Sequence, residues 1–156
     1  DFDNDGDPDL YVANDYGKNN LYENELGLFK DITESQKVED SASGMSVSWG
    51  DYNLDGRMDL YVSNMFSSAG TRITNQNQFK PTTSTEIKNR FKRFARGNTL
   101  FNNTTKGFTD DSITSGVTMG RWAWGSKFID FNNDGWEDII IANGYLSSDE
   151  DDTGDL

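Results

Sequence analysis

The sequence repeats one nine-residue pattern of oxygen-bearing side chains three times. The pattern reads Asp, aromatic, Asp or Asn, any residue, Asp, Gly, two further residues and Asp, and it occupies residues 1–9, 51–59 and 130–138. Oxygens at the first, third and fifth positions, a Gly that can adopt a positive φ, a carbonyl at the seventh position and a final carboxylate can wrap a hard cation. Calcium fits best, because it accepts about six to eight oxygens in flexible geometry. The alternative is that these residues only mark turns.

The residues after each loop distinguish it from an EF-hand loop. An EF-hand places its bidentate acid at about the twelfth position, which here is Val12, Val62 or Ile141. These apolar residues lie in short runs that predict buried strands. The carboxylate at the ninth position must therefore close the loop, which leads into a strand and not into a helix.

Further strand patterns lie between the loops. Residues 20–31 and 99–110 each hold two short runs separated by a Gly, which is typical of a β-hairpin. Runs at 45–50 and 122–129 then lead into the second and third loops. Units of about 50 residues with several short strands cannot bury both faces alone, which favours an all-β fold of stacked propeller blades.

The composition excludes several classes of chemistry. The 156 residues contain no His and no Cys, so imidazole bases, thiolate nucleophiles and disulfides are absent. A net charge of −13 argues against nucleic acid as a partner. No apolar run is long enough to span a membrane, so no membrane insertion is expected. Twelve of the 27 acidic residues lie in the three loops, so the acidity mainly reflects the loops.

The segment 65–97 departs from the repeat. It carries seven of the 14 basic residues and one acidic residue. A capping-box sequence at 83–86 precedes apolar residues at helical spacing, which predicts a short amphipathic helix. Either the helix packs its apolar face on the sheets and pairs its basic face with the acidic body, or it is a contact for an anionic glycan or another chain.

These motifs resemble FG-GAP/VCBS-type repeats, as in the integrin α-subunit propeller and bacterial exported repeat proteins. More narrowly, residues 97–103, 122–125, 130–138 and 142–145 are similar to the cartilage acidic protein/ASPIC–UnbV group, although the ASPIC–UnbV domain itself is not present. The resemblance implies about three repeat units of a seven-bladed β-propeller with a short helical insertion. Because propellers have about four to eight blades, we expect a fragment whose partners include the remaining blades.

The resemblance also implies which residues bind calcium, with about one ion per loop. Each loop would supply side chains from its first, third, fifth and ninth positions and the carbonyl of its seventh. Asn replaces Asp at the third position of the second and third loops, so the first loop is expected to bind most tightly. The implied ligands are Asp1, Asp3, Asp5, Asp7 and Asp9; Asp51, Asn53, Asp55, Arg57 and Asp59; and Asp130, Asn132, Asp134, Trp136 and Asp138.

We divide the chain into four parts. Residues 1–64 hold the first repeat units, with calcium loops at 1–9 and 51–59. Residues 65–97 form the basic insertion, and 98–148 a further repeat unit with the loop at 130–138. Residues 149–156 are an acidic tail or linker.

The preferred function is a calcium-binding repeat module of an exported protein, located outside the cell, at the cell surface or in the periplasm. It would bind a protein or glycan, as in adhesion, without catalysis. One alternative is a calcium-dependent polysaccharide lyase-like enzyme with Lys88, Lys92 or Arg93 as its base. The other is a purely structural repeat of a large surface protein or filament.

Overall fold

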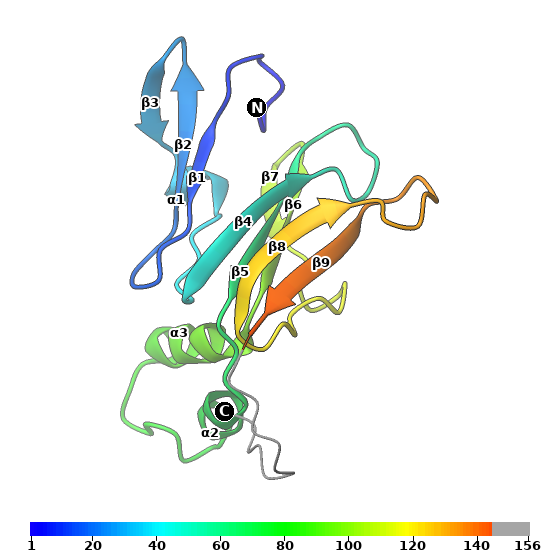
Figure 1. The fold of residues 1–156 in the computed structure, drawn as a ribbon. Coiled ribbons are helices and arrows are strands. Elements are labelled where there is room, and N and C mark those ends of the chain that lie inside the picture. The colour runs from blue at the N-terminus through cyan, green and yellow to red at the C-terminus, as the bar shows by residue number, and fades with distance from the viewer. Residues whose placement is uncertain (145–156) are drawn as a thin grey trace.

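The computed structural model describes residues 1–144, so the acidic tail expected at 149–156 lies outside the described residues. Three antiparallel sheets make up most of the regular structure (Figure 1). The all-β prediction is therefore confirmed, with three short helices added. In chain order the strands are β1 (Leu10–Val12), β2 (Asn20–Glu25), β3 (Leu28–Asp31), β4 (Gly44–Gly50), β5 (Asp59–Asn64), β6 (Thr99–Thr104), β7 (Gly107–Asp110), β8 (Ala123–Ile129) and β9 (Asp138–Asn143).

The sheets repeat one strand arrangement. The second sheet has the order β4-β5-β6-β7, the first is β1-β2-β3, and the third is β8-β9. Gly50 faces Asp59 across β4 and β5, and Ile129 faces Asp138 across β8 and β9. The pairing of β1, β2 and β3 matches that of β5, β6 and β7. The predicted order of strand, loop, strand, hairpin and strand is thus present within residues 1–144.

The second sheet lies between the other two and packs against both (Figure 1). Strand β5 is buried along its whole length. Successive side chains of a strand point to opposite faces, so Leu60 and Val62 join the core shared with the first sheet. Tyr61 instead packs with Leu100 of its own sheet and with Phe128 of the third sheet. Burial on both faces explains why an unbroken apolar run follows the loop.

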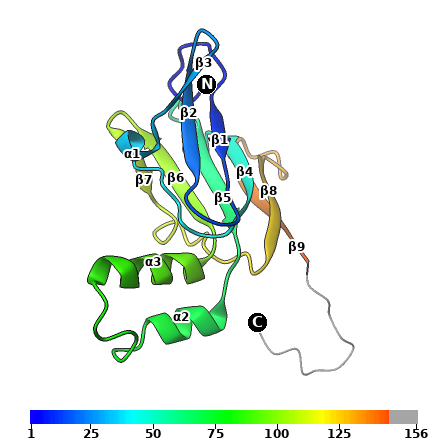
Figure 2. The same cartoon turned by 90° about the vertical axis from the view of Figure 1, so that its left-hand side faces the viewer.

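The insertion forms α2 (Ser68–Thr74) and α3 (Thr85–Arg96), which lie together beyond one end of the sheets (Figure 2). The Ser84 side chain accepts a hydrogen bond from the Ile87 N–H, so α3 begins within the predicted segment 83–86, one residue after the Thr83 cap that the capping-box sequence implies. The remaining helix, α1 (Thr33–Gln36), is a single turn after β3. No helix of the described part of the chain is long and apolar enough to cross a membrane.

Helix α3 is anchored through its basic side chains. Arg93 and Arg96 form ion pairs with Asp40 and Asp110 at 2.6 and 2.7 Å. Ala95 is also buried. The basic face therefore pairs with the acidic body, as the first interpretation expects. The expectation that the apolar face packs on the sheets is wrong for most of that face, which is exposed to solvent. Its exposed members are Ile87 at 44%, Phe91 at 39% and Phe94 at 46%.

Candidate metal centre

The three acidic loops lie at the end of the sheets opposite α2 and α3 (Figure 1). The loops at 51–59 and 130–138 connect β4 to β5 and β8 to β9, and the loop at 1–9 leads into β1. The repeated register therefore carries all three loops to one edge of the molecule.

Each loop folds around its own side-chain oxygens. In the second loop, the Asp55 N–H donates to Asp51 Oδ1 at 2.9 Å and to Asn53 Oδ1 at 3.1 Å, and the Gly56 N–H donates to Asp51 Oδ2 at 2.8 Å. These bonds hold oxygens of the first and third positions inside the turn. The third loop repeats all three bonds, with Asp134 and Gly135 as donors and Asp130 and Asn132 as acceptors.

The backbone conformation explains why each loop has a Gly at its sixth position. The fourth and sixth positions of every loop have a positive φ, which Gly adopts without strain. At the sixth position Gly6, Gly56 and Gly135 have φ values of 98°, 83° and 88°. The fourth position instead holds Asn4, Leu54 or Asn133, so a non-glycine residue takes the left-handed region in each loop.

The first loop brings three carboxylates together. Oxygens of Asp1, Asp3 and Asp9 all lie within 4.8 Å of one another. The side chain of Asp7 points elsewhere, because its Oδ2 accepts a hydrogen bond from the Leu26 N–H at 2.8 Å. This agrees with the implied role of Asp7, whose carbonyl and not its carboxylate would bind the ion.

The carboxylate at the ninth position is the most informative group. Asp59 is fully buried, and its Oδ1 accepts a hydrogen bond from the Asn103 N–H at 2.7 Å. Within residues 1–144, Asp59 Oδ2 and Asp138 Oδ2 are both buried without a well-aligned hydrogen-bond donor. Burial raises the pKa of Asp59 to about 6. The charges of Asp55 and Asp51 act in the same direction, and the backbone N–H groups of Asn103 and Tyr52 act against it.

A bound cation would account for this arrangement. A buried polar group without a partner costs about 1–3 kcal/mol, and a cation in the loop would supply the missing partner and compensate the clustered charge. The side chains at the first, third, fifth and ninth positions all offer oxygen ligands, as calcium requires. The residues present therefore fit calcium, although the assignment of the fifteen individual ligands stays a prediction.

Two asparagines of the hairpin strands hold the ninth position in place. The Asn24 N–H donates to Asp9 Oδ1 at 2.9 Å, and its side-chain amide donates to the Pro8 carbonyl at 2.9 Å. Asn103 makes the same two kinds of bond in the second loop, to Asp59 and to the carbonyl of Met58. The sequence pattern contains both asparagines, but only the alignment of the two hairpins could have indicated that they serve the loops.

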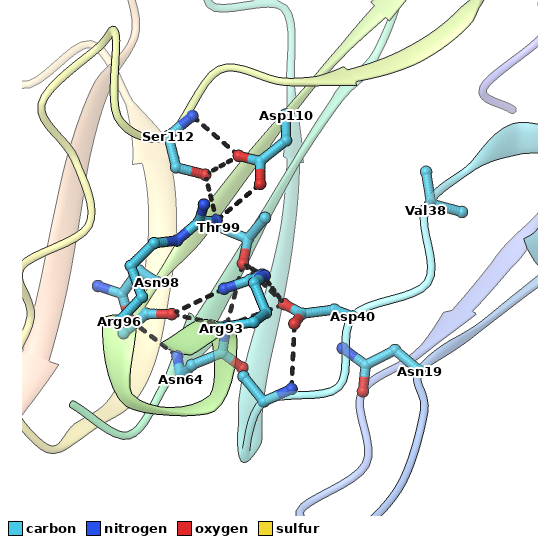
Figure 3. A network of polar contacts seen from close by, with 12 residues as sticks. Asn19, Val38, Asp40, Asn64, Arg93, Arg96, Asn98, Thr99, Asp110 and Ser112 are labelled. Atoms are coloured by element: carbon cyan, nitrogen blue, oxygen red, sulfur yellow. Dashed lines mark hydrogen bonds and ion pairs between the residues drawn. The ribbon is translucent and has the colours of Figure 1, made fainter. Parts of the chain in front are cut away.

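Arg93, a candidate base for the lyase alternative, lies in a buried polar network (Figure 3). Its guanidinium pairs with Asp40, which is fully buried. The same Asp40 carboxylate accepts hydrogen bonds from the Asn64 amide at 3.0 Å and from the Thr99 hydroxyl at 2.7 Å. A permanently charged side chain held in this way stabilises the insertion and is not a free base. Lys88 is partly exposed and Lys92 is exposed.

The fold and loops define a β-rich chain of repeated strand units whose connecting loops can hold a hard cation. Residues 1–62 match the family model of the FG-GAP-like repeat, which supports an FG-GAP repeat protein. The matched stretch contains the first two loops and most of β5, and the third loop is related to the second by shared hydrogen bonds and strand register. Neither the curated proteins nor the solved structures include a match to this chain.

Proposed function

We propose that the chain is a calcium-binding β-propeller module of an exported or cell-surface protein, which binds a protein or glycan without catalysis. The observation that carries the calcium part is the buried, unpartnered Oδ2 of Asp59, which lies in a loop already folded around further oxygen donors. The match of residues 1–62 to the FG-GAP-like repeat supports an exported, adhesion-type setting.

The sheet arrangement supports the propeller part of the proposal. The second sheet has four consecutive antiparallel strands, as a propeller blade has. The first sheet repeats the register of β5–β7 and the third repeats that of β4–β5. A seven-bladed ring, and the narrower grouping with cartilage acidic protein, remain parts of this proposal that rest on the sequence resemblance.

The role proposed for calcium is to fix the loops and thereby the sheets. A site with a Kd of about 10 μM in about 1 mM calcium adds about 2.7 kcal/mol of stability by mass action. Three such sites would equal a large part of the stability of an ordinary domain, about 5–15 kcal/mol. Calcium would then act structurally and not in a reaction.

The exposed face of α3 supports a binding role for the insertion. Ile87, Phe91 and Phe94 line a groove of about 370 Å³ together with Ser41 and Arg90. An exposed apolar groove beside basic side chains suits a protein or an anionic glycan, because both apolar contact and charge are available. Which of the two binds is part of what the experiments decide.

Thermal unfolding of the 156-residue chain tests the calcium part. We expect the melting temperature to be higher by about 10 °C or more in about 1 mM calcium than in EDTA, at about 2–4 °C per kcal/mol for a chain of this length. Asp55→Asn combined with Asp134→Asn should reduce the difference to the contribution of the first loop, whereas Asp15→Asn, an exposed acid outside the loops, should leave it unchanged. Equal melting temperatures in calcium and EDTA would show that the proposal is wrong.

A second experiment tests the non-catalytic part. The chain is incubated with acidic polysaccharides in calcium, and absorbance from an unsaturated uronate product is followed. We expect no turnover, but retention of the chain on an anionic glycan or a protein ligand in a binding screen. Turnover that Lys88→Ala or Lys92→Ala abolishes would overturn this part in favour of the lyase.

A further inference from the structure

One residue connects the first two loops. The Asn103 N–H donates to Asp59 Oδ1 in the second loop at 2.7 Å, and its side-chain amide donates to the Phe2 carbonyl in the first loop at 2.7 Å. The Phe2 N–H in turn donates to Asp9 Oδ2 at 2.9 Å. The closing carboxylates of both loops are therefore joined by a continuous path of hydrogen bonds through Asn103 and Phe2.

The path is buried and braced on the side of the second loop. Asn103 is 5% exposed and Phe2 is 6% exposed, so water competes little for these bonds. The Asn103 amide also donates to the Met58 carbonyl at 3.1 Å, and the Arg57 Nε–H donates to the Asn103 carbonyl at 2.8 Å. Arg57 also pairs with Asp55 of the same loop, so these contacts attach Asn103 firmly to the second loop.

A second contact joins the loops at the surface. The Asn4 side-chain amide donates to the Gly56 carbonyl at 3.2 Å. Phe2, Asn4, Arg57 and Asn103 also line a common pocket of about 250 Å³ between the two loops. The loops are therefore neighbours in space, although 50 residues of sequence separate their first aspartates.

We propose that the first and second loops bind calcium cooperatively and that Asn103 is the positioning residue that couples them. This inference rests on the proposed calcium function. A cation held by Asp59 fixes the whole carboxylate, including the Oδ1 that binds Asn103. Asn103 then holds the Phe2 carbonyl, and the N–H of the same residue orients Asp9. Occupancy of one loop thereby lowers the cost of ordering the other, and the effect is reciprocal.

Asn24 provides a matched control for substitutions at Asn103. Asn24 occupies the corresponding place in β2, but the bonds to Asp9 and Pro8 both go to the first loop. Asn24→Ala should therefore weaken the first loop without uncoupling it from the second. Asn103→Ala should uncouple them, because it removes the donor to Phe2.

Calcium titration of the ¹⁵N-labelled 156-residue chain measures the coupling. The amide resonances of Gly6 and Gly56 report the two loops separately. Asp3→Asn with Asp5→Asn weakens the first loop, and we expect the titration midpoint of Gly56 to move to about fivefold higher calcium, the lower end of ordinary coupling. The same pair of substitutions should leave that midpoint unchanged in an Asn103→Ala background, and should still shift it in an Asn24→Ala background.

The outcomes separate the coupling from the proposed function. Saturable shifts at both glycines with an unmoved Gly56 midpoint in the Asp3→Asn, Asp5→Asn chain would overturn the coupling and leave calcium binding intact. No saturable shift at either glycine in the unsubstituted chain would overturn both. This comparison needs no substitution at Asn103, so it decides the coupling even where Asn103→Ala does not fold.

Discussion

The guanidinium of Arg93 lies 2.6 Å from the carboxylate of Asp40, which is fully buried. Arg93 belongs to α3 of the insertion, and Asp40 belongs to the connection between β3 and β4. Figure 3 shows that Asn64 and Thr99 converge on the same carboxylate. The insertion is therefore fixed to the repeat units through a hydrogen-bonded charge pair and not through its apolar face.

Removal of one partner should be costly. Arg93→Met leaves Asp40 charged and buried, so we expect a loss of about 3–5 kcal/mol in the free energy of unfolding. Arg90→Met is the matched control, because its pair with Glu86 at 3.3 Å is exposed and should contribute less than about 0.5 kcal/mol. Urea denaturation in calcium measures both variants. Equal small losses would mean that the Arg93–Asp40 pair does not anchor the insertion.

A hydroxyl after each hairpin forms another repeated contact. Thr33 Oγ1 accepts a hydrogen bond from the Leu21 N–H at 2.8 Å, and Ser112 Oγ accepts one from the Leu100 N–H at 2.9 Å. The same hydroxyls donate to a nearby carboxylate, which is Asp31 in the first case and Asp110 in the second. Each hydroxyl thus links the start of one strand to the end of its hairpin.

This repeated hydroxyl predicts which substitutions the chain tolerates. Ser112→Ala leaves the buried Leu100 N–H without its acceptor, so we expect a loss of about 1–3 kcal/mol. Ser112→Thr should cost much less, because Thr33 performs the same role in the first hairpin. Urea denaturation gives both values. A loss for Ser112→Thr as large as for Ser112→Ala would show that packing, and not the hydroxyl, is what matters.

The loops and strands were predictable because their signals are local. Nine-residue spacing, a Gly at a positive φ and an apolar run after the loop all lie within about 14 consecutive residues. The position of α3 was predictable for the same reason, since Ser84 and the helical spacing are local as well. The structure adds the strand register, in which equivalent residues of successive units take equivalent partners.

The shared roles of single residues were not predictable from the sequence. Asn103 and Phe2 are 101 residues apart, and nothing in either segment indicates that they meet. Asp40 has no counterpart in the other repeat units, so no alignment marks it as the partner of Arg93. The exposure of Phe91 and Phe94 depends on where the insertion leaves the sheets, which helical periodicity does not encode.

The raised pKa of Asp59 predicts how the metal-free protein responds to pH. Burial raises this pKa to about 6, above the value of the unfolded chain. A carboxyl that holds its proton more tightly in the folded state favours folding as it protonates. The melting temperature in EDTA should therefore rise as the pH is lowered from about 7 to about 5. Asp31 and Asp110 have lowered pKa values, and their stabilisation is lost only below about pH 4.

Melting curves at several pH values check this response. In EDTA, Asp59→Asn should flatten the rise between about pH 7 and pH 5, because it removes the titrating group. In saturating calcium the rise should vanish or reverse, since protonation of Asp59 then competes with the ion. A melting temperature in EDTA that falls steadily over this range would contradict the raised pKa.

Close packing before the second loop gives a further prediction. Gly50 ends β4, and a Cβ there would lie 2.6 Å from Phe128 Cγ and 2.7 Å from Phe128 Cβ. Phe128 is buried between the second and third sheets and cannot move aside freely. We expect Gly50→Ala to cost about 1–3 kcal/mol through overpacking. It should also weaken calcium binding at the second loop, because Asp51 follows directly and would be displaced with the strand.

Gly125→Ala is the matched control. Gly125 also lies within a strand, but among residues 1–144 a Cβ there would meet only the Ala142 Cβ at 3.8 Å, an ordinary contact. Both substitutions remove the same backbone freedom from the unfolded chain, so that effect cancels in the comparison. Urea denaturation in EDTA isolates packing, and the Gly56 amide titration reports the second loop. Similar stability for the two variants would show that the sheets separate readily at Phe128, and similar Gly56 titration midpoints would show that the loop does not depend on their close approach.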